Sequence, residues 1–257
     1  MATYLLKKSY QRKNLKEINF KDLWGSHGVF TTMWIFDKPA KILFFKKHIK
    51  NLIKSLKVYK LNKKKIEKNI LKLIKLNVDK NKKYNHLLRI AINNKIISVS
   101  LRKRIKPKSK FNLKLINYKR TRPEFKNLKY KNIIKHLSKI DTSSTDIGLC
   151  VNNKLLESAT SNILFVSKNK IYSPISKFYK GITFNFFEKK VRKIIKKNIF
   201  IDSLNIYDEI ILIGSGKGIV SVGCIKKPYW RRKSSKIYRF LSKIYHEPVT
   251  NCPRYNG

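Results

Sequence analysis

Acidic residues and cysteines are both scarce in this chain. Its 257 residues include 61 Lys and Arg but only 14 Asp and Glu, which gives a formal net charge of +47. The three cysteines, Cys150, Cys224 and Cys252, lie far apart and form no CxxC motif. An odd number of isolated cysteines argues against structural disulfides and zinc sites. We therefore expect a reducing, cytoplasmic location and no bound metal.

Long apolar runs are also absent. No run reaches the roughly 18 residues that a membrane-spanning helix requires, and residues 1–12 lack the apolar core and cleavage site of a signal peptide. We expect no membrane partner. The hydrophobic fraction of 42% and the aromatic fraction of 12% are still sufficient for a folded core.

The basic charge has two explanations. A strongly basic protein can be a nucleic-acid-binding protein without catalytic activity. However, the lysines run from Lys7 to Lys243 without a basic tail, and Ile and Asn, which share AT-rich codons with Lys, are also abundant. Nucleic-acid readers usually concentrate Arg and aromatic residues in one element. We favour a compositional bias of the genome and expect no specific nucleic-acid partner.

Strand and helix patterns alternate irregularly, which predicts a mixed α and β chain. The pattern predicts helices over 48–58, 63–76, 128–140, 184–195 and 233–245. It predicts strands over 29–36, 42–45, 87–92, 95–101, 146–151, 155–156, 163–166, 171–173, 206–214 and 219–222. The basic segment 102–110 contains Pro107 and reads as a linker, so we predict two domains, 1–110 and 111–257.

One acid has unusual neighbours. Glu157 follows Leu155-Leu156 and precedes the small residues Ser158-Ala159-Thr160-Ser161, whereas most other acids lie beside lysines or in polar turns. A carboxylate in an apolar setting is costly unless a cation or a proton donor meets it. An ordinary ion pair with a lysine, or a turn cap, remains the simpler alternative.

The segment around Glu157 belongs to an ordered set of motifs. These are Trp24-Gly25-Ser26-His27-Gly28-Val29-Phe30, His48-Ile49-Lys50-Asn51-Leu52, Glu157-xxx-Ser161-Asn162, Lys180-Gly181-Ile182-Thr183 and Gly214-Ser215-Gly216-Lys217-Gly218. The set resembles the fold-type IV, pyridoxal-phosphate-dependent enzymes, the class IV aminotransferases. The resemblance implies an α+β, two-domain fold like that of D-amino-acid aminotransferase, with pyridoxal 5′-phosphate at the domain interface, and a homodimer.

The resemblance assigns roles to two residues. Phe125-Lys126-Asn127-Leu128-Lys129-Tyr130 is similar to the family's segment with the Schiff-base lysine, and the separation 157 − 126 = 31 residues fits the family. Lys126 is therefore the catalytic candidate in the larger C-terminal domain, and Lys129 is its nearest competitor. A carboxylate against the cofactor's ring nitrogen keeps it protonated, which is the implied role of Glu157.

The phosphate group needs backbone N–H groups and hydroxyls at a helix start. Gly181, Ile182 and Thr183 open a predicted helix, and Asn162 precedes it in the motif. Ser215 and Gly216 offer a second set of donors. An ordinary helix cap and an ordinary turn are the simpler alternatives. The fragment GSGKG lacks the frame of a nucleotide-binding P-loop, because Gly218 follows Lys217.

The chain departs from the family pattern at several positions. Asn51 stands where the family has a phosphate-binding arginine, Thr31 where it has an acid, His27 where it has an aspartate, and Phe184 where an arginine is frequent. Lys50 is one possible replacement for the arginine. The five histidines show no ligand spacing, and His48 is interpreted as structural. Phe30, Arg89 and Arg102 are the substrate-binding candidates.

The resemblance implies an enzyme acting on an amino-acid-like or chorismate-derived small molecule. The short chain favours a lyase that converts 4-amino-4-deoxychorismate to p-aminobenzoate and pyruvate for folate synthesis. Amino transfer from a branched-chain or D-amino acid is the alternative within the family, because both reactions use the same motifs. A non-catalytic, nucleic-acid-binding protein is the alternative outside it.

Overall fold

The structure is a computed structural model that describes residues 3–62 and 64–256. By contacts, the chain divides into two units. The first comprises Met1–Arg104, Phe125–Lys131 and Asn251–Gly257, and the second comprises Ile105–Glu124 and Asn132–Thr250. The segment with Lys126 thus belongs to the first unit, although its neighbours on both sides belong to the second.

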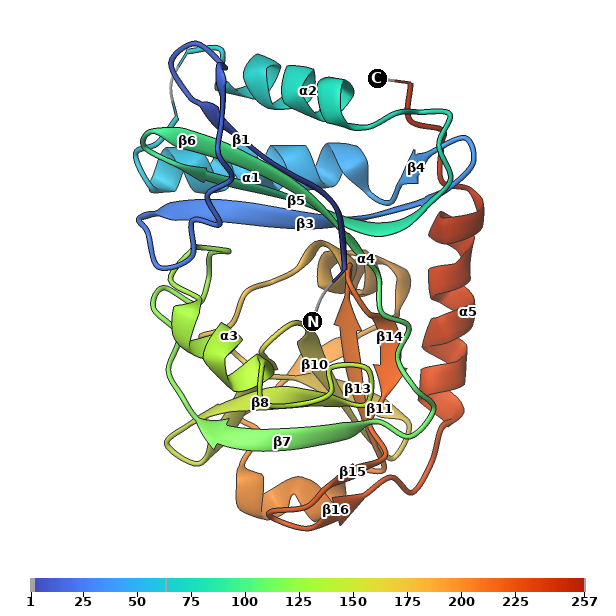
Figure 1. The fold of residues 1–257 in the computed structure, drawn as a ribbon. Coiled ribbons are helices and arrows are strands. Elements are labelled where there is room, and N and C mark those ends of the chain that lie inside the picture. The colour runs from blue at the N-terminus through green and yellow to red at the C-terminus, as the bar shows by residue number, and fades with distance from the viewer. Residues whose placement is uncertain (1–2, 63, 257) are drawn as a thin grey trace. The chain divides into compact units, whose positions relative to one another are not determined.

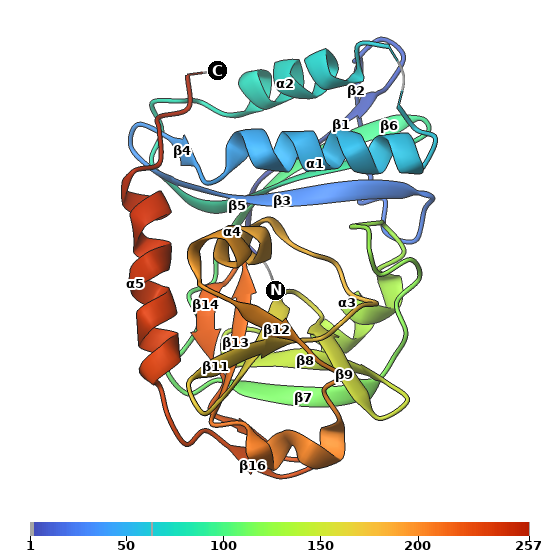
Figure 2. The same ribbon diagram turned by 180° about the vertical axis from the view of Figure 1, so that it is seen from behind.

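The first unit is built on an antiparallel sheet with the strand order β2-β1-β6-β5-β3-β4. Helix α1 packs on β3 and helix α2 packs on β6, and both views draw the two helices along the same side of the sheet (Figures 1 and 2). The element bounds are β1 Tyr4–Gln11, β2 Glu17–Ile18, β3 Gly28–Asp37, β4 Lys41–Ile42, α1 Phe45–Val58, α2 Ile66–Asn77, β5 Tyr84–Asn93 and β6 Ile96–Lys103.

Helical spacing of apolar residues explains how both helices cover the sheet. Helix α1 buries Ile49, Leu52 and Leu56, and helix α2 buries Ile70 and Ile74, while lysines occupy their outer faces. These side chains join the inward-facing residues of the sheet in one core. Burial of this apolar area is the main stabilising contribution in the unit.

The second unit contains two five-stranded sheets. Their strand orders are β12-β11-β10-β13-β14 and β16-β15-β7-β8-β9. The element bounds are β7 Asn112–Asn117, α3 Lys131–Leu137, β8 Thr145–Val151, β9 Lys154–Ser158, β10 Asn162–Ser167, β11 Lys170–Ser173, α4 Ile182–Lys190, β12 Ile194–Lys196, η1 Ile201–Ile206, β13 Glu209–Gly214, β14 Gly218–Ser221, β15 Cys224–Ile225, β16 Trp230–Arg231 and α5 Lys236–Thr250.

A buried acid fixes the last helix of this unit. Glu209 at the start of β13 is fully buried. Its carboxylate accepts hydrogen bonds from the Ser234 hydroxyl (3.0 Å) and from the backbone N–H groups of Ile237 (2.9 Å) and Tyr238 (2.8 Å). A carboxylate at a helix N-terminus accepts hydrogen bonds from the free N–H groups and interacts favourably with the positive end of the helix dipole. Helix α5 packs along β13 and β14 (Figure 2).

Most predicted elements are confirmed with shifts at their ends, but three predictions are wrong. The predicted helix 128–140 shortens to α3, because residues 126–128 pair with β3 instead. The predicted helix 184–195 ends at Lys190, and Ile194–Lys196 pairs with β11 as strand β12. The predicted strand 42–45 is reduced to β4, and Phe45 opens α1. Residue 63, the predicted start of the second helix, lies outside the described residues.

The predicted division into 1–110 and 111–257 differs from the observed contacts at three places. The boundary falls near residue 104, and both Phe125–Lys131 and Asn251–Gly257 group with the first unit. As a statement about independently folding domains, the division stays a prediction. No helix within the described residues is long and apolar enough to span a bilayer.

Candidate functional site

The Lys126 segment is held by the beginning of strand β3. The backbone N–H of Phe30 donates to the carbonyl of Lys126 (3.0 Å), and the N–H of Leu128 donates to the carbonyl of Gly28 (2.9 Å). A Cβ atom at Gly28 would lie 2.3 Å from the Ile92 carbonyl oxygen and 2.6 Å from Leu128. Only glycine therefore permits this close approach.

Lys126 and Lys129 have different surroundings. Lys126 is half-buried, and its Nζ lies 5.2 Å from the centre of the Phe30 ring. Lys129 is exposed, and its Nζ donates to the Gly25 carbonyl (3.0 Å). A lysine that acts as a nucleophile needs a partly desolvated amine. The burial therefore favours Lys126 over its competitor, in agreement with the motif.

A neutral histidine, His48, lies close enough to Lys126 for the lysine charge to lower its pKa. His48 on α1 is buried and shares a 2.9 Å hydrogen bond with the hydroxyl of Thr31. Burial, with a smaller contribution from the charge of Lys126, lowers the pKa of His48 to about 3. The imidazole is therefore uncharged at neutral pH. Thr31, which replaces the family's acid, serves here as its hydrogen-bond partner.

The other departures from the family pattern have varied surroundings. His27 shares a 3.2 Å hydrogen bond with the Tyr59 backbone carbonyl, and its imidazole packs against the Tyr59 ring. Lys50 is exposed, and Asn51 is half-buried on α1. Whether either residue contacts a phosphate group stays a prediction.

The three substrate-binding candidates lie in the first unit. The Phe30 ring packs against the rings of Trp24 (4.9 Å between centroids) and Tyr130 (5.6 Å). The Arg89 guanidinium pairs with Asp22 and lies 4.4 Å from the Trp24 ring centre. Burial lowers the pKa of Arg102. Because Asp22 already neutralises Arg89, binding of a substrate carboxylate by Arg89 requires exchange of that pair.

Glu157 pairs with an arginine that the sequence did not single out. The Arg120 guanidinium donates from Nε to Oε1 (2.8 Å) and from Nη2 to Oε2 (3.3 Å), and both side chains are buried. The N–H of Tyr179 donates to Oε2 (3.3 Å). Burial raises the pKa of Glu157 to about 7, although Arg120 and Tyr179 lower it. The two-point contact orients the carboxylate.

Neither sequence interpretation anticipated this partner. The simpler alternative expected a lysine or a turn cap, and the resemblance expected a cofactor nitrogen. Arg120 lies 126 − 120 = 6 residues before Lys126, in a basic stretch without a distinguishing pattern. The only available signal was the physical requirement that a buried carboxylate must have a cationic or proton-donating partner.

A cluster of polar groups surrounds the N-terminus of α4. The N–H of Gly181 donates to Asn162 Oδ1 (3.0 Å), and the Asn162 amide donates to the Tyr179 carbonyl. A Cβ atom at Gly181 would lie 2.8 Å from Asn162 Oδ1. The helix begins at Ile182, so its first N–H groups have no acceptor within the helix. Asn162 thus connects the start of β10 to the start of α4.

Two hydroxyls in this cluster are buried without a hydrogen-bond partner. They are the Oγ atoms of Ser161, just before β10, and of Thr183, in the first turn of α4. A buried hydroxyl without a hydrogen-bond partner lowers the stability of the fold unless a ligand supplies that partner. We call Ser161, Asn162, Gly181–Thr183 and the turn Gly214–Gly216 the phosphate cradle. Its donors fit a phosphate group, which supplies several acceptor oxygens.

The turn after β13 closes the cradle. Asn162 and Ile213 are paired residues of β10 and β13, and a Cβ atom at Gly214 would lie 3.1 Å from Ser161 Oγ. Gly214, which leads into Ser215 and Gly216, therefore lies against Ser161. Lys217 in the same turn pairs with Asp146 (3.4 Å), which is fully buried.

Asp146 also holds the opposite side of the cradle. Its carboxylate accepts hydrogen bonds from the hydroxyls of Ser158 (3.0 Å) and Thr160 (2.6 Å). These residues flank the turn that presents Ser161. One buried carboxylate thus fixes two turns that are about 60 residues apart in sequence, since 217 − 158 = 59. The sequence interpretation did not single out Asp146, and it named Ser161 only as part of a motif, without a role.

Comparisons with known proteins agree with this arrangement. The sequence profile of the family amino-transferase class IV matches residues 28–225. No curated protein sequence matches the chain. The structure resembles a branched-chain aminotransferase from Thermoproteus uzoniensis, with 15% identity, a TM-score of 0.74, and coverage of 96% of this chain and 94% of that one.

Two further structures are similar. A branched-chain aminotransferase from Thermobaculum terrenum in its PLP form has 16% identity, a TM-score of 0.72, and coverage of 94% and 93%. A candidate 4-amino-4-deoxychorismate lyase from Legionella pneumophila has 17% identity, a TM-score of 0.69, and coverage of 86% and 91%. At these identities the likeness shows the fold. The profile match confirms the family, and with it the enzyme class and the pyridoxal 5′-phosphate cofactor implied by the sequence motifs.

Proposed function

The chain belongs to the amino-transferase class IV family, and on that premise we propose that Lys126 binds pyridoxal 5′-phosphate, that Glu157 meets its ring nitrogen and that the phosphate cradle holds its phosphate. The observation that supports this proposal most directly is the pair of buried, unsatisfied hydroxyls of Thr183, in the first turn of α4, and Ser161, just before β10. Without an anion, nothing in the described residues satisfies them.

The residues divide the work by their chemistry. When bound, the cofactor supplies an electron-withdrawing ring that stabilises negative charge at the substrate's α-carbon. Glu157, oriented by Arg120, would accept a hydrogen bond from a protonated ring nitrogen and would favour that protonation state. A cation beside Glu157 lowers the pKa of its carboxyl from about 7. Lys126 takes up and returns the substrate proton as base and acid.

For the reaction, we propose release of pyruvate from 4-amino-4-deoxychorismate to form p-aminobenzoate. The family membership and the resemblance to the Legionella pneumophila structure support this reaction. The substrate carries two carboxylates, which suits an enzyme with so few acids. Arg102 and, after exchange of Asp22, Arg89 are the proposed carboxylate-binding residues.

Amino transfer from a branched-chain amino acid is the second candidate. The resemblance to the Thermoproteus uzoniensis aminotransferase extends over 96% of this chain, against 86% for the candidate lyase. Both reactions begin with loss of the proton at the α-carbon, so Lys126 and Glu157 serve either one. No observation on the chain favours a D-amino acid.

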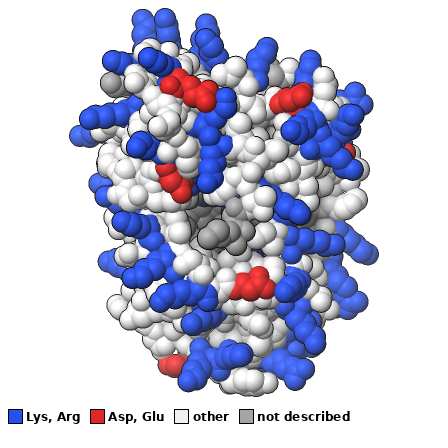
Figure 3. All heavy atoms as spheres, viewed as in Figure 1, with Lys and Arg blue, Asp and Glu red and all other residues white. Residues whose placement is uncertain are grey.

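A non-catalytic role in nucleic-acid binding has weaker support. On the face that Figure 3 shows, Lys and Arg are dispersed among neutral residues and do not gather in one stripe. Nucleic-acid readers place their cations along a groove or a recognition element. The family match favours an enzyme, and the charge accounts for weak, salt-sensitive binding of anions.

One experiment tests the cofactor assignment. The purified protein is incubated with pyridoxal 5′-phosphate, its visible spectrum is recorded, and the bound cofactor is fixed by borohydride reduction before peptide mapping. We expect the label on Lys126, loss of the visible band in the Lys126→Ala variant, and an unchanged band in the matched Lys129→Ala control. A label on another lysine would refute the role of Lys126.

A second experiment separates the two reactions. The holoenzyme is mixed either with 4-amino-4-deoxychorismate or with a branched-chain amino acid and a 2-oxo acid. Pyruvate with p-aminobenzoate identifies the lyase, and a new amino acid identifies the aminotransferase.

We further propose a cytoplasmic homodimer, as the family resemblance implies. Sedimentation equilibrium near twice the chain mass of 30.4 kDa would support the dimer.

A further inference from the structure

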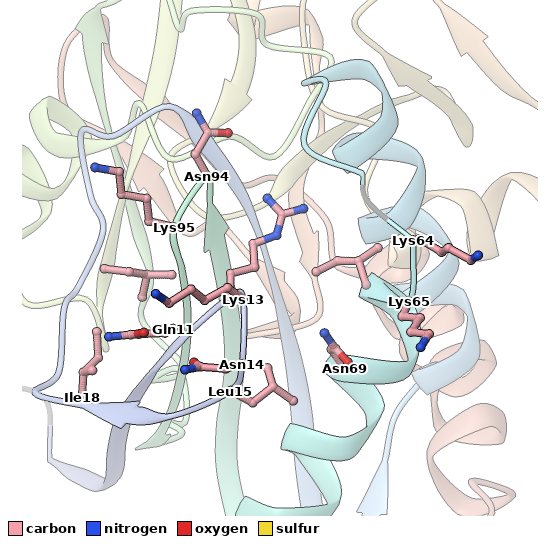
Figure 4. Close-up of a pocket in the computed structure, with 13 residues that line it drawn as sticks. Gln11, Lys13, Asn14, Leu15, Ile18, Lys64, Lys65, Asn69, Asn94 and Lys95 are labelled. Carbon is pink, nitrogen blue, oxygen red and sulfur yellow. The ribbon is translucent and has the colours of Figure 1, made fainter.

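A basic cavity of about 820 Å³ lies in the first unit, where no proposed cofactor residue lines it. Its cationic side chains are Arg12, Lys13, Lys64, Lys65 and Lys95. Among the described residues that line it, none is acidic. Like charges gathered around one hollow repel one another unless an anion neutralises them. Figure 4 shows Lys13 and Lys95 on one side of the hollow and Lys64 and Lys65 on the other.

Three separate segments supply these cations. Lys13 lies in the turn after β1, Lys95 lies in the β5–β6 turn, and Lys64 and Lys65 lie just before α2. The two turns lie at one end of adjacent strands, since Gln11 and Ile96 are paired residues of β1 and β6. The cavity therefore depends on the folded sheet and does not follow from a basic run in the sequence.

Arg12 is the part of the cavity that most requires a ligand. Only 7% of its surface is exposed. Its guanidinium donates to the carbonyls of Asn93 (Nη1, 3.1 Å) and Leu61 (Nη2), and its buried Nε has no partner. No carboxylate within the described part of the chain forms an ion pair with Arg12. Burial lowers its pKa, because two carbonyls compensate a buried cation only in part.

The remaining lining residues indicate which part of a ligand is recognised. Gln11, Asn14, Asn69 and Asn94 add amide donors, and Leu15, Ile18, Ile66 and Ile96 add aliphatic surface. None of the described lining residues is aromatic. Nucleobases in single-stranded RNA and DNA are usually held by stacking on aromatic rings. Cations and amides without a stacking surface match phosphate groups and not bases.

We propose that this cavity binds a small polyphosphate anion, inorganic or as the phosphate chain of a nucleotide, through Lys13, Lys65 and Lys95 around Arg12. Several adjacent phosphates match several cations that surround one hollow. The buried guanidinium receives the counter-charge that the described residues do not supply. The base of a nucleotide adds no affinity.

The proposal is independent of the cofactor assignment. The cavity residues share no member with Lys126, Glu157 or the phosphate cradle. Binding is therefore measured on protein saturated with pyridoxal 5′-phosphate, so that the cradle is not a second site for the probe. Thr183→Val protein serves as a further check, since it alters the cradle and leaves the cavity intact.

The test is calorimetric titration with inorganic triphosphate, ATP and orthophosphate. We expect one triphosphate per chain, affinity for ATP within about threefold of that for triphosphate, and much weaker binding of orthophosphate. Raising the salt concentration from about 50 to about 200 mM should weaken triphosphate binding, because exposed charges are screened. The triple variant K13Q/K65Q/K95Q should lose at least about tenfold in affinity for triphosphate, because each lysine removed should weaken binding by a few-fold.

A matched triple variant separates the cavity from the general charge. K54Q/K72Q/K75Q removes the same number of charges from exposed positions on α1 and α2 outside the cavity. We expect its affinity within about twofold of the wild type. Equal losses in the two triple variants would refute the proposal, as would absence of triphosphate binding. ATP binding more than tenfold tighter than triphosphate, or tighter saturable binding of single-stranded RNA, would overturn it as well.

Discussion

Replacing Arg120 with methionine should destabilise the protein by an amount that grows with pH. The wild-type Glu157 carboxyl has a pKa of about 7, raised from 4.5 mainly by burial and partly restored by Arg120. Without the guanidinium, burial acts unopposed except by the Tyr179 N–H, and the pKa rises further. The carboxyl of the variant therefore keeps its proton at a pH where the wild type has lost it.

The sign follows from proton linkage. Unfolded Glu157 is ionised above about pH 5, so folding takes up a proton wherever the folded carboxyl is protonated, and stability then falls by about 1.4 kcal/mol per pH unit. In the wild type this decline runs from about pH 4.5 to 7 and then ends. In Arg120→Met it continues above pH 7. Between pH 7 and 8.5 the difference between the two proteins should widen by up to about 2 kcal/mol.

This pH-dependent loss adds to a smaller one that does not depend on pH. Removing the guanidinium leaves buried oxygens of Glu157 without their hydrogen-bond donors, which costs about 1 to 3 kcal/mol. The measurement is urea unfolding of cofactor-free protein at pH 6, 7 and 8.5. The matched control is Lys108→Met, which removes a pair with Asp141 whose side chains are 64% and 54% exposed. The control should cost less than about 1 kcal/mol at every pH.

The variant Glu157→Gln completes the test. It retains the side-chain shape but cannot titrate, so the decline between pH 4.5 and 7 should disappear. Equal destabilisation by Arg120→Met at pH 6 and pH 8.5 would refute the reasoning. It would mean that the buried carboxyl does not titrate near neutral pH.

Three further predictions concern the surroundings of the site. Because the pKa of His48 is lowered to about 3, stability should fall as pH drops from 6.5 to 3, by at most about 5 kcal/mol, and His48→Asn should remove this acid loss in urea titrations. Thr183→Val should leave the cofactor-free protein as stable or more stable and weaken cofactor binding about tenfold by fluorescence titration, whereas the strand variant Thr32→Val should not. Lys217→Met should cost about 2 to 4 kcal/mol, because it leaves the buried Asp146 unpaired.

Each of these predictions has an outcome that contradicts it. If His48→Asn loses as much stability between pH 6.5 and 3 as the wild type does, other groups cause the acid sensitivity. Lost stability without lost cofactor affinity in Thr183→Val would assign the hydroxyl to folding and not to the phosphate. A cost for Lys217→Met no larger than that for Lys108→Met would show that the Asp146 pair behaves as an exposed one.

The pattern of apolar residues predicted most elements of both units, because helices and strands with one buried face have characteristic spacings. It failed where long-range pairing outweighed local preference. Leu128 opens the predicted helix 128–140, but residues 126–128 pair with β3, and Leu128 is buried against Phe30 and Ala91. Likewise, Ile194 continues the spacing of α4 but pairs with β11.

The sequence by itself determined the family, the candidate lysine and the candidate glutamate, because each lies in a motif of fixed spacing. It also determined that Glu157 needs a partner, since few acids were present and this one had apolar neighbours. Only the tertiary structure decided that the partner is Arg120, that Asp146 joins the two turns of the cradle, and that Arg12 lies buried among lysines without an acid. These pairings join residues that are distant in sequence, and a side chain's spacing along the chain does not specify which distant group will neutralise its charge once water is excluded.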